Sequence, residues 1–211
     1  MSQYIVYGAG GHAKVVIDIL QACDEEILGI IDDNSSELQW NSFPILGRGS
    51  DLKKIKLDYQ DVLIIIAIGD NLTRMNIANR LSREGFSFGK AIHPSAIIGS
   101  SVSVGEGTVI MPNVVVNAHS CIGEHVVINT SATVDHDCKV DSFAHVSPGV
   151  HMAGNVQIGR CTIIGVGSSI IPGVNIGEST VVGAGSCVVK DIPNCVLAFG
   201  SPARVVKNIK N

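Results

Sequence analysis

The chain has few charged residues and no excess of basic ones. Asp, Glu, Lys and Arg together make up 16% of its 211 residues, and aromatic residues make up only 4%. Fifteen basic residues against nineteen acidic ones give a net charge of −4. Nucleic acids and anionic membrane surfaces are bound chiefly through clustered Lys and Arg. The composition therefore excludes both as expected partners.

Long hydrophobic runs are also missing. The longest aliphatic stretch, Val62 to Ile68, is far too short to span a bilayer, so no membrane insertion is predicted. Residues 1–4 carry no basic segment and lead directly into a strand pattern, so we expect no signal peptide. The six cysteines form no C-x-x-C pair, which favours reduced, buried thiols. These features predict a cytoplasmic protein.

What the chain does have is a strict six-residue repeat. An aliphatic residue returns at every sixth position, and a small residue stands two positions before nearly every one. The series is Ile92, Ile98, Val104, Ile110, Val116, Ile122, Ile128, Val134, Val140, Val146, Met152, Ile158, Ile164, Ile170, Ile176, Val182 and Val188. A hexapeptide period indicates a parallel β-helix with three short strands per coil. A β-sandwich is the alternative, but its turns recur every 8–12 residues without a fixed phase.

Gly, Asn or Asp commonly follows the large inward residue, as at Gly99, Asn117 and Asp135. These residue types tolerate a positive φ angle, which a tight corner commonly requires. The pattern therefore predicts that the position after each inward residue is the left-handed corner of the coil.

The first 90 residues show a different pattern. A buried strand over 4–7 leads into the turn Gly8-Ala9-Gly10-Gly11-His12-Ala13, an apolar helix pattern follows, and a second strand over 27–31 ends at Asp32-Asp33. This is the context of a dinucleotide-binding turn, in which bare backbone approaches a phosphate at a helix N-terminus. A tight turn needed only for packing is the alternative. With a third strand over 61–68, the region is small for a redox dinucleotide, so a nucleotide-sugar fits better.

Five histidines lie within 33 residues of the repeat, and none occupies an inward position. They are His119, His125, His136, His145 and His151, and we expect them at corners or on outer faces. His136 stands between Asp135 and Asp137, and flanking carboxylates orient an imidazole and raise its basicity, as a general base requires. A solvated surface histidine is the alternative interpretation.

Metal-binding and covalent chemistry find little support. The histidines lack metal-site spacing, and His145 and His151 lie on successive sides of the prism, so no metal site is predicted. No G-x-S-x-G motif or Cys–His pattern indicates a nucleophile. Direct attack by a substrate needs only a base and an oxyanion donor, which exposed corner N–H groups can supply.

Several of these motifs together resemble the hexapeptide-repeat sugar acetyltransferases, a family that includes sialic acid O-acetyltransferases and bacterial UDP-4-amino-sugar N-acetyltransferases. The resemblance covers the whole chain. It depends on residues 7–13, 31–33, 129–138, 145–149 and 200–203.

The resemblance implies a fold and an assembly. A small N-terminal α/β Rossmann-like domain (residues 1–90) would hold the nucleotide-sugar, and a left-handed parallel β-helix with a C-terminal tail (residues 91–211) would form homotrimers. Acetyl-CoA would lie in the groove between neighbouring prisms as the cosubstrate.

The resemblance also implies roles for individual residues. His136 matches the catalytic histidine, and Asp137 stands where some N-acetyltransferases carry Glu. His145, Gly154, Gly165 and Val166 match acetyl-CoA positions, with His145 near the acetyl carbonyl. Gly10, Gly11, His12, Asp32 and Asp33 match nucleotide-sugar positions.

The expected reaction is N-acetylation of a 4-amino-4,6-dideoxy sugar on a nucleotide, with UDP favoured. O-acetylation of a sialic acid or related sugar is the nearest alternative. A non-catalytic assembly partner that only binds a nucleotide-sugar is the alternative of a different class.

Overall fold

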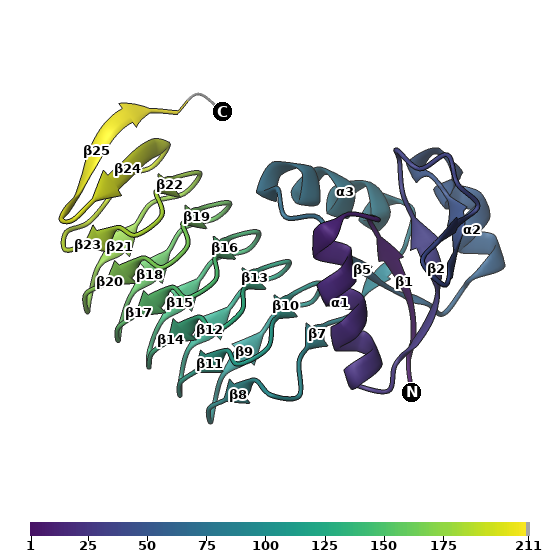
Figure 1. Cartoon of the computed structure of the whole chain (residues 1–211), viewed down its shortest axis with the longest axis horizontal. Coiled ribbons are helices and arrows are strands. Elements are labelled where there is room, and N and C mark those ends of the chain that lie inside the picture. Colours follow the sequence, from purple (N-terminus) through teal and green to yellow (C-terminus); the bar gives the residue numbers. More distant parts are fainter. Residues whose placement is uncertain (210–211) are drawn as a thin grey trace.

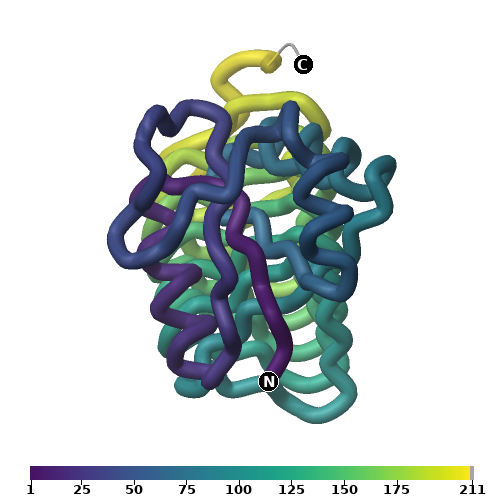
Figure 2. Tube along the Cα trace, turned by 90° about the vertical axis from the view of Figure 1, so that its right-hand side faces the viewer, coloured from purple at the N-terminus to yellow at the C-terminus, as the bar shows by residue number. Residues whose placement is uncertain are grey.

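The computed structural model describes residues 1–209. It consists of an α/β domain docked against one side of a prism of stacked coils (Figure 1). Seen along the perpendicular direction, the N-terminal domain lies in front of the coils (Figure 2). None of the helices within residues 1–209 is long and apolar enough to cross a bilayer.

The N-terminal domain is built on a six-stranded sheet of order β3-β4-β2-β1-β5-β6. All neighbours are parallel except the β3–β4 hairpin. The strands are β1 (Gln3–Tyr7), β2 (Glu26–Ile31), β3 (Gln39–Trp40), β4 (Phe43–Gly47), β5 (Leu63–Ile66) and β6 (Ser87–Phe88). The three long apolar strands β1, β2 and β5 are those that the sequence predicted. The sheet is wider than expected because short strands extend it on both sides.

Helices cover both faces of this sheet (Figure 1). They are α1 (Gly11–Ala22), the 3-10 turn η1 (Gly49–Asp51), α2 (Leu52–Asp58) and α3 (Asn71–Arg83). In α1 the buried residues Ala13, Val16, Ile17, Ile19 and Leu20 recur at helical spacing and therefore form one apolar face. Asp70 caps α3, because its side chain accepts a hydrogen bond from the N–H of Thr73 at 2.8 Å.

The repeat region forms a left-handed β-helix with three parallel sheets. The domain-facing sheet contains β7 (Ala91–Ile92), β10 (Val109–Ile110), β13 (Val127–Ile128), β16 (His145–Val146), β19 (Ile163–Ile164) and β22 (Val181–Val182). The second sheet contains β8 (Ile97–Ile98), β11 (Val115–Val116), β14 (Thr133–Val134), β17 (His151–Met152), β20 (Ser169–Ile170) and β23 (Cys187–Val188). The third contains β9 (Ser103–Val104), β12 (Cys121–Ile122), β15 (Lys139–Val140), β18 (Gln157–Ile158) and β21 (Asn175–Ile176).

The prism core is formed by the predicted inward pairs. From Ile110 onward every large inward residue is buried, and so is Cys138 at a small inward position. Hydroxyl side chains at small inward positions donate hydrogen bonds to carbonyl oxygens of the following coil, for example Thr108 Oγ1 to Gly123 O at 2.8 Å and Thr162 Oγ1 to Gly177 O at 2.6 Å. These bonds offset the cost of burying a polar group.

The prediction about the corners was wrong in position. A positive φ occurs three residues after each large inward residue, from Ser101 to Gly185, rather than one residue after it. The glycines that directly follow the large inward residues are required for a different reason. A Cβ at Gly99 would lie 2.7 Å from the backbone nitrogen of Ala118, and one at Gly165 would lie 2.5 Å from that of Ala184. Glycine is therefore required there because adjacent coils approach closely, not because of φ.

The C-terminal segment ends the prism with a hairpin. Strands β24 (Val196–Gly200) and β25 (Ala203–Asn208) form an antiparallel hairpin that extends the domain-facing sheet beyond β22. Residues 210–211 lie outside the described part of the chain.

The two domains are joined by a buried arginine on α3. Arg74 is 1% exposed, and its guanidinium donates to the carbonyl oxygens of Ile68 and Gly69 in its own domain and of His125 and Phe143 in the prism, at 2.9–3.1 Å. Burial lowers the pKa of Arg74 to about 10, so it stays charged near neutral pH.

Neighbouring contacts extend this junction along the prism. Asn71 Nδ2 donates to Cys161 O at 2.9 Å. His125, Phe143 and Cys161 are one coil apart from each other, so α3 is bound to the same edge of three successive coils. We call it the α3 edge.

Candidate functional site

His136 lies on an exposed edge of the prism, where β14 leads into β15. This edge joins the second and third sheets, and we call it the His136 edge. The Nδ1 atom lies 2.7 Å from Asp137 Oδ2, and the His136 side chain is 60% exposed. Asp135 holds the backbone of the same corner, since its Oδ1 accepts hydrogen bonds from the N–H of His136 and from Asn117 Nδ2, both at 2.8 Å.

These carboxylates prepare the imidazole to accept a proton. The hydrogen bond to Asp137, followed by the charge of Asp135, raises the pKa of His136 above its ordinary value. An ionised carboxylate can only accept, so Nδ1 carries the proton and Nε2 of the neutral ring is left as the free base. The sequence placed His136 at a corner beside carboxylates, and the structure has that geometry.

Gly154 lies directly beside the His136 ring, one coil further along the same edge. A Cβ at this position would fall 2.6 Å from both Cε1 and Nε2 of His136. Among residues 1–209, no backbone hydrogen bond uses the Gly154 N–H. Gly154, whose N–H group is unused, therefore lies against the free imidazole nitrogen. This pairing can serve an acyl transfer, in which a base acts near an oxyanion donor.

The other expected acetyl-CoA residues lie elsewhere on the prism. Gly165 and Val166 follow β19, on the edge between the domain-facing and second sheets, and Val166 is 54% exposed. His145 lies in β16 of the domain-facing sheet. One protomer thus brings Gly154 to His136 but does not bring Gly165, Val166 or His145 to the same edge.

His145 instead faces His12 at the junction of the two domains. Their ring centroids are 6.5 Å apart. His145 Nδ1 lies 3.3 Å from Gly69 O, and Nε2 lies 3.1 Å from Asn129 Nδ2, so Nδ1 donates and Nε2 accepts. Burial lowers the pKa of both histidines to about 4, so both rings are neutral at pH 7. His12 Nε2 is buried without a hydrogen-bond partner among the described residues.

The glycines of the N-terminal turn divide into two kinds. Gly8 has φ of +115°, and a Cβ there would lie 2.8 Å from the Ile68 side chain, so the fold itself requires glycine. Gly10 and Gly11 have ordinary φ angles, and a Cβ at either would meet nothing within 4 Å. Gly10 is the N-cap of α1, and no acidic side chain lies in the first turn. This leaves space and unpaired N–H groups for a phosphate.

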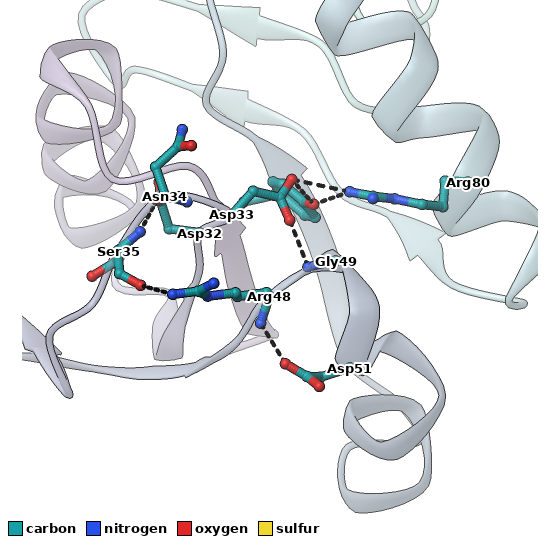
Figure 3. Close-up of polar contacts among 9 residues, drawn as sticks. Asp32, Asp33, Asn34, Ser35, Arg48, Gly49, Asp51 and Arg80 are labelled. Carbon is teal, nitrogen blue, oxygen red and sulfur yellow. Dashed lines mark hydrogen bonds and ion pairs between the residues drawn. The ribbon is translucent and has the colours of Figure 1, made fainter.

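Asp32 and Asp33 point in opposite directions (Figure 3). Asp32 accepts hydrogen bonds from the N–H groups of Ala9, Asn34 and Ser35 at 2.7–2.8 Å and lines a pocket of about 430 Å³ beside Gly10. The sequence did not identify two other residues of this pocket, Glu37 and Trp40, because they lie in a segment that no motif marks.

Asp33 turns toward α3, away from the pocket beside Gly10. It accepts hydrogen bonds from Tyr7 Oη at 2.7 Å and the Gly49 N–H at 2.7 Å, and it pairs with Arg80 at 3.2 Å. Partial burial acts to raise the pKa of Asp33, but the hydrogen bonds outweigh it and hold that pKa below its usual value. In this structure Asp33 ties β1, α3 and η1 together.

Residues 3–81 match the PglD N-terminal domain family. The chain is 36% identical over 110 residues to UDP-N-acetylbacillosamine N-acetyltransferase of Bacillus subtilis, a match that covers 52% of this chain and only 51% of that relative.

Solved structures of similar proteins match over nearly the whole chain. A single-residue variant of perosamine N-acetyltransferase from Caulobacter crescentus, solved with CoA and GDP-perosamine, is 41% identical with a TM-score of 0.92, over 99% of this chain and 98% of that one. The acetyltransferase domain of PglB from Neisseria gonorrhoeae, solved with acetyl coenzyme A, is 36% identical with a TM-score of 0.90, over 97% and 98%. The chain belongs to the family of hexapeptide-repeat sugar N-acetyltransferases.

Proposed function

We propose that this protein transfers the acetyl group of acetyl-CoA to the 4-amino group of a nucleotide-linked 4-amino-4,6-dideoxy sugar. The observation that carries the proposal is the placement of His136, oriented by Asp137, against Gly154, whose N–H makes no backbone hydrogen bond among residues 1–209. The relatives support it, because two of them are named as N-acetyltransferases of amino sugars. Two of the solved structures contain CoA or acetyl-CoA.

In the proposed reaction the sugar amine attacks the thioester carbonyl directly. The new C–N bond forms while His136 Nε2 removes a proton from the nitrogen, and Asp137 stabilises the imidazolium. The Gly154 N–H stabilises the oxyanion of the tetrahedral intermediate. The C–S bond then breaks, and the CoA thiolate takes up the proton. No side chain forms an acetyl-enzyme in this scheme.

The nucleotide-sugar would lie along the start of α1. Its pyrophosphate would bind over Gly10 and Gly11, where the backbone is bare and the helix dipole favours negative charge. Its sugar would extend from there past His12, with Asp32 beside the base or ribose. Asp33 is already bound by Tyr7, Gly49 and Arg80, so its contribution to binding would be indirect.

The site would be completed by a second copy of the chain. The nucleotide domain docks on one sheet, whereas His136 lies on the edge formed by the other two. In a homotrimer, the base and Gly154 of one protomer would face the sugar held by its neighbour. Gly165 and Val166 of that neighbour, on a different edge, would form the opposite wall of the acetyl-CoA groove.

The proposed reaction belongs in the cytoplasm, which supplies acetyl-CoA and nucleotide-sugars. The family resemblance favours UDP as the carrier. The relatives divide on this point, since one is named for a UDP-sugar and another was solved with GDP-perosamine.

The test is an assay of thiol release from acetyl-CoA with a 4-amino sugar linked to UDP or GDP, and with sialic acid. Acetamide formation on a nucleotide-linked amino sugar supports the proposal. Acetylation of sialic acid alone would establish the O-acetyltransferase alternative. Failure to bind acetyl-CoA in calorimetry would favour a non-catalytic partner protein.

A further inference from the structure

The pocket beside Gly10 contains one large aromatic ring, that of Trp40. This is the only tryptophan in the chain, and it is half-buried at the end of β3. The β3–β4 hairpin continues the sheet beyond β2, and this places the ring near the carboxyl ends of β1 and β2. An aromatic ring beside a phosphate-binding turn offers a stacking surface for a flat, neutral group.

The polar groups of the pocket indicate which part of a nucleotide fits. Among residues 1–209, no lysine or arginine lines it, and two carboxylates, those of Asp32 and Glu37, do. A pyrophosphate would be repelled here, whereas Gly10 at the pocket margin leads to the free N–H groups of α1. The pocket therefore suits the base, and the α1 N-terminus suits the phosphates.

The two carboxylates are not equivalent. Asp32 already accepts three backbone N–H groups. The carboxylate of Glu37 makes no hydrogen bond or ion pair to any residue in the described range 1–209. Of the two acidic side chains in the pocket, Glu37 is therefore the one whose carboxylate is free to accept hydrogen bonds from a ligand.

A free carboxylate distinguishes between bases by their N–H donors. Guanine presents N1–H and N2–H₂ side by side, and a carboxylate can accept both in a bidentate pair. Uracil presents a single N3–H between two carbonyl oxygens, which a carboxylate repels. Resting on the proposed nucleotide-sugar function, we propose that this pocket is the nucleobase site, in which Trp40 stacks on the base and Glu37 selects guanine over uracil.

The first experiment uses the tryptophan as the probe. The fluorescence of the wild-type protein is titrated with GDP and, separately, with UDP, without acetyl-CoA. Because the chain has one tryptophan, the emission reports on this pocket alone. The proposal expects GDP to quench the emission at lower concentration than UDP. It is overturned if UDP binds as tightly as GDP, if neither binds, or if calorimetry detects GDP binding that leaves the emission unchanged.

The second experiment uses variants and calorimetry. Glu37→Gln keeps the shape but cannot accept two donors, so the Kd for GDP is expected to rise about 5- to 150-fold while that for UDP stays or falls. Trp40→Ala should weaken GDP binding about 5- to 150-fold, and Trp40→Phe should restore most of the loss. Glu106→Gln removes the same charge from the exposed prism surface and serves as the control. Equal GDP affinity in wild type and Glu37→Gln contradicts the selection of guanine.

Acetyl transfer is measured in parallel to separate this inference from the proposed function. If GDP binding depends on Trp40 and Glu37 but no amino sugar is acetylated, the base site stands and the proposed function fails. If an amino sugar is acetylated with unchanged KM in both variants, the proposed function stands and the base site is wrong. Circular dichroism of each variant checks that the fold is kept.

Discussion

The Nδ1 atom of His136 lies 2.7 Å from Oδ2 of Asp137, the residue that follows it in the chain. Adjacent side chains rarely face each other, and here the corner makes it possible because Asp137 has a φ of +57°. Asp137 has a shorter side chain than the Glu that some N-acetyltransferases carry at this position. The positive φ brings the shorter carboxylate within reach.

The first prediction concerns the pH dependence of catalysis. His136→Ala should lower turnover about 10²–10⁴-fold with little change in acetyl-CoA affinity. Asp137→Asn should lower the pKa of His136, because its hydrogen-bonding carboxylate raises it. The imidazole must be neutral to accept a proton, so the acid limb of kcat/KM should move to lower pH. Turnover should fall about 100-fold or more, since the ring loses its orientation.

A pH–rate profile of both variants checks this prediction. An acid limb that stays in place in Asp137→Asn would show that Asp137 does not set the basicity of His136. Normal turnover in His136→Ala would remove His136 from the role of base.

The second prediction concerns Gly154. A Cβ at this position would lie 2.6 Å from Nε2 of His136, so Gly154→Ala should displace the ring. We expect kcat to fall about tenfold or more, because small misplacements of a catalytic group are costly. The φ of Gly154 is not positive, so stability should change little. Steady-state kinetics and thermal unfolding together test this, and unchanged kcat would place the acetyl group elsewhere.

The third prediction concerns the junction between the domains. Arg74→Met should lower the free energy of unfolding by at least about 3 kcal/mol, because several buried carbonyl oxygens lose a charged donor. Arg74→Lys should recover little of the stability lost in Arg74→Met, because an ammonium group cannot reproduce the forked geometry of the guanidinium. Arg83→Met, on the exposed end of the same helix, is the matched control. Urea denaturation measures all three variants, and equal stability of the two Met variants would contradict the assigned role.

The fourth prediction concerns stability at acid pH. Burial lowers the pKa of His12, His125 and His145 to about 4. These histidines are protonated near pH 6.5 in the unfolded chain but only near pH 4 in the folded chain. Their contribution to the free energy of unfolding is therefore fully present above pH 6.5 and is lost as the pH falls from 6.5 to 4. Each histidine contributes a slope of up to about 1.4 kcal/mol per pH unit.

His125 allows this effect to be isolated. Its ring stacks on Phe143, one coil further on, and Nδ1 has no hydrogen-bond partner among the described residues. Phe143 adopts the same left-handed corner, so Phe is tolerated there. His125→Phe should therefore make the free energy of unfolding fall less steeply with pH. Urea denaturation at pH 7 and pH 5 should show a smaller loss of that free energy in the variant than in the wild type. A parallel decline in both proteins would refute the assignment.

The prism could be predicted from the sequence because the six-residue repeat is strict and is visible within short stretches of the chain. One aliphatic residue in six identifies the inward face from Ile92 to Val188, and buried residues such as Val134 and Ile164 follow that register. The corner conformation was misplaced because glycine has two distinct uses, and sequence alone does not separate left-handed φ from close coil packing. Ser131 and Phe143, both with positive φ, carry no glycine signal.

The junction between domains was beyond sequence reasoning. His125 was expected at a corner or on an outer face, and it does lie at a corner, yet it is 4% exposed because the N-terminal domain covers it. Arg74 follows no motif, and its partners are carbonyl oxygens, which every residue has. Trp40 and Glu37 were missed because β3 has only two residues and adds no periodicity. Such contacts depend on tertiary arrangement.

The central claim is that one protomer supplies His136 to a sugar held by its neighbour, and mixed trimers test it most directly. His136→Ala lacks the base. Gly10→Asp places a carboxylate in the phosphate position, while Asp is a favoured N-cap and a Cβ there meets nothing within 4 Å, so folding is kept. The two inactive proteins are coexpressed with different tags, and mixed trimers are isolated through both.

If the site is shared, every mixed trimer, whether two-to-one or one-to-two, pairs an intact nucleotide domain with an intact His136 in one of its three sites, or about a third. We expect acetyl transfer at about a third of the wild-type rate. Mixed trimers no more active than either variant alone would show that each protomer carries a whole site, and would contradict the account.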